Sequence, residues 1–130
     1  MDDLLTSIQF RIADGTLLPA SYYATMDRNA ALDARDGDEF AAEWTRLFKE
    51  VERRWSEAPI SAEARATAEV IRRESFLAVS RATGQHEIAS YVSDDLDLIV
   101  RSRLLGMAEP LVTTLWDCYD RCRFPRPPFE

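Results

Sequence analysis

The chain has few of the residues from which catalytic sites are usually built. Its 130 residues include one histidine, two cysteines and four glycines, and Lys49 is the sole lysine. The four glycines are scattered at positions 15, 37, 84 and 106, which excludes a glycine-rich phosphate-binding loop. No Gly-x-Ser-x-Gly turn is present, so a serine nucleophile has no recognisable setting. The sequence contains no complete catalytic site, and we expect a protein that is not an enzyme.

The single histidine and the two cysteines do not make a metal site. Helical ligand pairs stand three or four residues apart, and positions 82, 83, 89 and 90 around His86 are Ala, Thr, Ala and Ser. Cys118 and Cys122 have a suitable spacing, but tetrahedral zinc needs further ligands, and only His86 remains. We therefore expect no cofactor, no metal, an exposed histidine and two free thiols.

Acidic residues dominate the charge of the chain. The formal net charge is −7 at pH 7, and the isoelectric point is near 4.8. Such a chain repels nucleic acid phosphates, so we expect no nucleic-acid partner and, in its place, a basic protein. No segment is apolar enough to span a membrane and no secretory signal is visible, which predicts no membrane contact and a cytoplasmic location. The preference for arginine over lysine and the abundant alanine suggest a bacterial source.

Apolar residues recur every three to four positions between the glycines and prolines, which predicts an all-α fold. We expect a single-domain helical bundle of five to six helices over residues 1–122, followed by a proline-rich C-terminal tail over residues 123–130. The expected helices cover about residues 2–13, a short segment after Pro19, a segment from a capping box at Asp36 and Glu39 to the residues before Pro59, about 61–83, about 85–106, and a segment from about 109.

The segment from Gln85 to Arg101 is predicted to be an amphipathic helix with an acidic face. Its apolar stripe contains Ile88, Tyr91, Val92, Leu96 and Ile99, and its polar stripe contains Glu87, Ser90, Asp94, Asp97 and Arg101. Asp94, Asp95 and Asp97 have no basic residue between them, and such unneutralised charge can steer a basic partner. A second acidic region contains Asp27, Asp33, Asp36, Asp38, Glu39 and Glu43. The alternative for both regions is an ordinary solvated surface.

The size, the acidity, the helical layout and the segment SYVSDDLDLIV together resemble the small acidic α-helical immunity proteins of bacteria. This resemblance implies a protein-binding module that neutralises a basic toxin by occluding its active surface. The expected partner-binding residues are Glu87, Asp94, Asp95, Asp97, Tyr91 and Phe76. The carboxylates would meet arginine or lysine on the toxin, and Tyr91 or Phe76 would supply an apolar anchor.

Two other interpretations remain open at this point. The chain can be a self-associating structural or adaptor protein without catalytic activity, forming a homodimer through the face that carries Phe76. A small enzyme is the less favoured alternative, because it needs His86 and Glu87 to meet a carboxylate from another helix in an apolar pocket.

Overall fold

The computed structural model describes residues 3–129, which form seven helices and no strand. The helices are α1 (Asp3–Ala13), α2 (Ala20–Thr25), α3 (Arg28–Arg35), α4 (Asp38–Glu57), α5 (Ala62–Thr83), α6 (His86–Leu104) and α7 (Pro110–Asp120). The all-α prediction is confirmed, whereas the predicted number of helices is too low. Asp2, the expected start of the first helix, lies outside the described residues. None of the described helices combines the length and apolar composition that a membrane crossing requires.

The additional helix arises from a break in the segment after Pro19. The backbone is extended at Met26, which ends α2. The side chain of Asp27 then accepts a hydrogen bond of 3.1 Å from the backbone amide of Ala30. An aspartate in this position satisfies an amide that the first helical turn leaves unpaired. A new helix, α3, therefore begins at this point.

Several other helix ends follow from the sequence. Ser61 caps α5 through its side chain, and Gly84 ends that helix with a left-handed backbone (φ +67°) that other residues rarely adopt. The capping box predicted at Asp36 and Glu39 does not form. Gly37 precedes α4 without a side-chain cap, while Asp36 ends α3.

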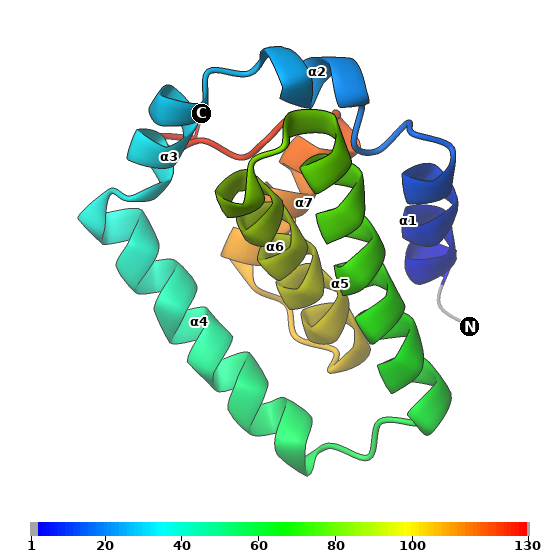
Figure 1. Ribbon diagram of the computed structural model, residues 1–130. Helices are drawn as coiled ribbons and strands as arrows, with labels where there is room; N and C mark the ends of the chain where they lie inside the picture. The colour runs from blue at the N-terminus through cyan, green and yellow to red at the C-terminus, as the bar shows by residue number, and fades with distance from the viewer. Residues whose placement is uncertain (1–2, 130) are drawn as a thin grey trace.

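α6 is the central helix of the bundle. It contacts α4, α5 and α7, and Figure 1 shows α4 and α5 on either side of it. Twelve of its 19 residues are buried, including Asp95, Asp97 and Arg101. The apolar core around α6 contains Leu47 of α4, Ile71 of α5 and Leu115 of α7, all fully buried. Polar side chains on such a helix face other helices instead of water, and burial without a partner would be costly.

The C-terminal tail packs against the bundle. Figure 1 shows it running back from α7 beside α3. Phe124 is buried, and the ring of Phe129 lies 5.7 Å from that of Phe40 at the start of α4. The predicted boundary between a bundle at 1–122 and a tail at 123–130 stays a prediction, and residue 130 lies outside the described residues.

Candidate protein-binding surface

Asp95 lies at the centre of a buried hydrogen-bond cluster. Its exposed fraction is 0%, and Arg35 donates a hydrogen bond of 2.8 Å to each of its carboxylate oxygens. The indole nitrogen of Trp44 and the hydroxyl of Tyr119 donate further bonds of 2.9 Å and 2.6 Å. The cluster joins α3, α4, α6 and α7. Asp95 is therefore a structural residue that a partner cannot reach directly, contrary to the expectation of an exposed carboxylate.

Aromatic rings enclose the guanidinium group of Arg35. Its carbon Cζ lies 4.9 Å from the ring centre of Phe40, 5.0 Å from that of Tyr91 and 5.2 Å from that of Phe124. Burial lowers the pKa of Arg35, but the charge and hydrogen bonds of Asp95 outweigh burial and raise it above the ordinary value. Arg35 therefore remains charged, and the contact of its guanidinium group with the ring of Phe124 links the tail to the bundle.

Asp97 is likewise directed into the bundle. Its carboxylate lies 2.9 Å from a guanidinium nitrogen of Arg101, and Arg101 also pairs with Glu52 of α4. Burial raises the pKa of Asp97, although Arg101 and Arg72 oppose this rise. Only the first half of the predicted acidic face of α6 therefore reaches solvent.

The two more exposed carboxylates of that face are paired with arginines from other helices. The side chain of Glu87 is 63% exposed and pairs with Arg28 of α3. The side chain of Asp94 is 40% exposed and lies 3.0 Å from a guanidinium nitrogen of Arg72 on α5. The expectation of unneutralised charge on this helix is therefore wrong. These pairs join residues far apart in the sequence, so their spacing along the helix gave no sign of them.

Tyr91 and Phe76 lie on adjoining surfaces. Tyr91 donates a hydrogen bond of 2.7 Å to Asp36, which raises the pKa of the tyrosine. Phe76 is half-buried and stacks on His86 with 6.0 Å between ring centres. Phe76 and Asp94 line a groove of about 410 Å³ between α5 and α6. Tyr91 and Asp94 line a smaller pocket of about 160 Å³ between α4 and α6. The structure thus brings these three predicted residues onto one continuous stretch of surface.

The second acidic region is less neutralised. Asp33, Asp38, Glu39 and Glu43 are exposed, and none of them forms an ion pair within residues 3–129. The last three line a groove against α7 and the tail. The charge was visible in the sequence, but the groove was not, because its other wall comes from residues more than 60 positions away.

His86, Cys118 and Cys122 carry the side chains most suited to acid-base or nucleophilic chemistry. His86 is exposed, and its Nδ1 lies 3.1 Å from the hydroxyl oxygen of Ser80. Cys118 and Cys122 are free thiols. Over the described range, no group of three or more His, Cys, Asp or Glu side chains is placed to hold a metal ion.

Comparison with known families matches almost the whole bundle. Residues 7–126 match the family described as immunity protein PIM1. A comparison with curated proteins finds no match. The matched region contains the Asp95 cluster, the exposed part of α6 and the carboxylates Asp38, Glu39 and Glu43 of the groove, whereas the three tail residues that line the groove lie beyond it. The resemblance to bacterial immunity proteins inferred from the sequence is confirmed, and the chain belongs to the immunity protein PIM1 family.

Proposed function

We propose that the protein neutralises a basic toxin in the cytoplasm by binding it and occluding its active surface, without turnover. Membership of the immunity protein family is the observation that carries this proposal. The net charge of −7 supports a basic partner, because oppositely charged surfaces attract one another and associate faster.

The exposed part of α6 is the proposed contact surface. Glu87 and Asp94 are held in partly exposed ion pairs, which typically contribute only about 0–1 kcal/mol each. A toxin can therefore offer its own arginines or lysines to these carboxylates at little cost. Tyr91 and Phe76 supply apolar area beside them, and aromatic anchors of this kind often dominate binding energy.

Asp95 and Asp97 have a different role in this proposal. Both are buried. Asp95 holds α6 against α3 through Arg35. Asp97 pairs within α6 with Arg101, which itself pairs with Glu52 of α4. They position the exposed side chains of the helix and do not touch the toxin. A substitution at either residue would thus change the stability of the fold, and would change toxin binding only through that effect.

Capture followed by co-expression tests this proposal. The chain is immobilised and exposed to lysate of the source bacterium, and the bound proteins are identified after washing at low and then moderate salt. The captured toxin domain is next expressed in a host with or without the chain. We expect the chain to restore growth. A captured toxin that kills equally well in its presence would refute the immunity role.

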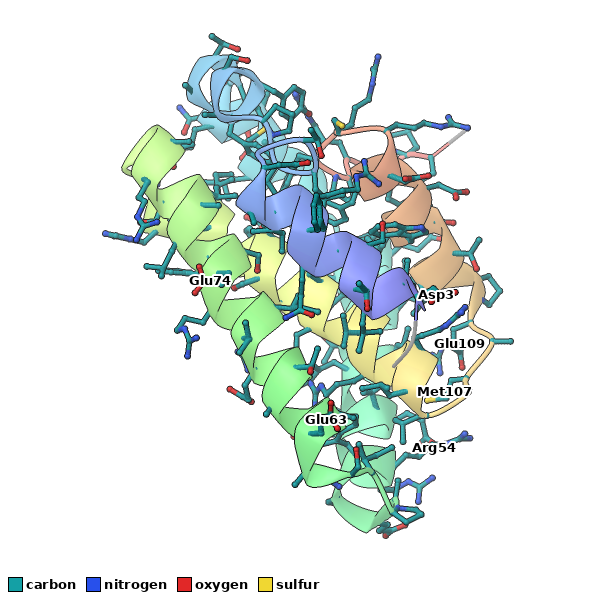
Figure 2. The ribbon with its side chains drawn as sticks, turned by 90° about the vertical axis from the view of Figure 1, so that its right-hand side faces the viewer. Asp3, Arg54, Glu63, Glu74, Met107 and Glu109 are labelled. Atoms are coloured by element: carbon teal, nitrogen blue, oxygen red, sulfur yellow. The ribbon has the colours of Figure 1, made fainter. Side chains whose placement is uncertain are left out.

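A variant in which two carboxylates are replaced by amides tests whether α6 forms the contact surface. E87Q/D94N removes two carboxylates from the proposed contact, and D3N/E63Q removes two exposed carboxylates from the α1 and α5 side of the molecule, where Figure 2 labels both residues. Association with the toxin at low salt should slow by about three- to tenfold in E87Q/D94N and remain unchanged in the control. Equal rates for all three proteins would remove α6 from the interface.

If the chain self-associates instead, the expected dependence on salt is the opposite. A homodimer built on the face of Phe76 would persist as salt is raised, because apolar contacts are not screened. Sedimentation at several salt concentrations separates this alternative from salt-sensitive toxin binding.

A further inference from the structure

A groove of about 570 Å³ lies between the start of α4, one side of α7 and the C-terminal tail. Its apolar lining includes Phe40, Leu111, Pro127, Pro128 and Phe129. The rings of Phe40 and Phe129 are tilted by 57° and lie 5.7 Å apart, so the helix and the tail are in direct contact there. Concave apolar sites of this kind are where the anchoring side chains of protein partners bind.

The same groove carries three carboxylates and no basic residue. Asp38, Glu39 and Glu43 line it, and no ion pair of the described residues involves any of them. Glu39 and Glu43 stand one helical turn apart, so both lie on the side of α4 that faces the groove. This contrasts with α6, where each carboxylate has an arginine partner.

We infer that this groove takes up a protein segment in which an apolar side chain is flanked by arginine or lysine. The apolar side chain packs against Phe40 and Phe129, and the basic side chains pair with Glu39 and Glu43. The inference rests on the proposed function, since it assigns the segment to the toxin. Phe40 also lines the pocket beside Tyr91, so the groove and the α6 surface form one continuous interface.

The charges around the tail select this occupant. A second cavity of about 600 Å³ shares Pro128 and Phe129 of the tail with the groove. Three arginines and one aspartate line it, so its charged lining is positive overall: Arg121, Arg123, Arg126 and Asp117. An acidic segment would be attracted to that cavity and repelled from the groove. The groove therefore discriminates in favour of positive charge, and the apolar lining adds a requirement for a hydrophobic anchor.

A second copy of this chain is a poorer occupant. Its own segments with the required chemistry are Arg46–Lys49 and Arg123–Arg126. In the first, Leu47 is fully buried and Phe48 stacks on Trp44 of the same helix. In Arg123–Arg126, arginines flank an aromatic residue. Phe124 in that segment is only 3% exposed and packs on Arg35 within its own bundle. The segment cannot present this anchor to another molecule without unfolding its tail.

Peptide binding tests the chemistry of the groove directly. The probe is a capped synthetic peptide with one tryptophan between two pairs of arginines. Matched peptides replace the arginines with glutamates or the tryptophan with serine. Each peptide is titrated into isotopically labelled protein, and the NMR signals of the groove residues are followed. Only the probe should shift these signals. Raising the salt from about 50 to about 300 mM should weaken binding several-fold.

Two variants with substitutions in the groove and one control variant show whether the peptide binds in the groove. E39Q/E43Q should weaken binding of the probe by about three- to tenfold, as expected for the loss of two exposed charge pairs. Thr114 lines the groove from α7, and T114R should weaken binding by at least about tenfold because it adds positive charge and bulk. D3N/E63Q loses the same charge as E39Q/E43Q and should bind normally. Unfolding midpoints in urea verify that all variants fold.

Binding of the captured toxin separates this inference from the proposed function. Weaker toxin binding by both groove variants, with unchanged binding by D3N/E63Q, supports the inference. Equal toxin binding by all four proteins overturns the inference and leaves the immunity role intact. A captured toxin that the wild type binds but does not neutralise refutes the proposed function, while groove-specific peptide binding would still support the chemistry of the site. A dimer that only the groove variants abolish would assign the groove to a second copy and overturn the inference.

Discussion

Replacing Asp95 with asparagine should destabilise the bundle by about 3–5 kcal/mol, the range expected when a buried ion pair loses one partner. Asparagine keeps the shape of the side chain but removes its charge and turns one acceptor into a donor. In either orientation that donor would face a guanidinium nitrogen of Arg35, together with the hydroxyl of Tyr119 or the indole nitrogen of Trp44, all of which donate to Asp95 now. Arg35 would remain charged with only 2% of its side chain exposed.

Urea unfolding followed by circular dichroism measures this effect. A loss of about 3–5 kcal/mol is a large share of the roughly 5–15 kcal/mol that typically stabilises a small protein, and should lower the thermal midpoint by roughly 10–20 °C. Asp94→Asn is the matched control, because its carboxylate belongs to a partly exposed pair and should cost less than about 1 kcal/mol. A D95N protein within about 1 kcal/mol of the wild type would refute the structural role of the cluster.

A double substitution distinguishes the charge from the packing. Arg35→Met with Asp95→Leu leaves no unpaired charge in the interior, so it should be more stable than Asp95→Leu alone. The coupling between the two positions should be at least about 0.5 kcal/mol in a double-mutant cycle. Additive effects would show that Arg35 and Asp95 do not stabilise one another.

Three further predictions concern a helix cap and two other carboxylates. Ser61→Ala should cost about 1 kcal/mol in urea unfolding, since the serine side chain caps α5; an unchanged midpoint would contradict this. Hydrogen bonds from Arg53 and Arg54 lower the pKa of Glu50 to about 2, so its stabilisation is present at neutral pH and lost as the pH falls from 4.5 towards 2. Thermal midpoints of Glu50→Gln should therefore fall less steeply in acid than those of the wild type. Burial raises the pKa of Asp97, so the wild type should lose stability relative to Asp97→Asn as the pH rises from 3.8. The opposite trend would show that Arg101 outweighs burial.

Local signals in the sequence predicted most of the helix boundaries. Gly15 and Gly84 adopt left-handed backbones at helix ends, with φ of 80° and 67°, and Pro110 begins α7. These residues act through their own backbone, so their neighbours in the sequence are sufficient to place them. The break between α2 and α3 has a weaker signal, because Asp27 lies in a region rich in acidic residues, where sequence alone does not distinguish a helix cap from surface charge.

The candidate site was harder to predict, because its geometry depends on contacts between distant segments. The acidic spacing of α6 was correct, yet Arg28, Arg35 and Arg72 reach it from three positions that no local pattern connects to it. One signal did point to burial. The consecutive apolar residues Leu98–Val100 point to three different sides of α6, which is typical of an enclosed helix.

The fixed position of the Phe40 side chain affects the entropy of binding at the groove. One guanidinium group and the ring of Phe129 already hold its side chain in place, and the backbone beneath it belongs to the first turn of a 20-residue helix. A partner that packs on this ring does not have to restrict the rotamers of Phe40. The entropy that a flexible surface loses on association, about 0.5–1.5 kcal/mol for each side chain that must be ordered, is lost here during folding. Affinity at this position can therefore come from a small contact area.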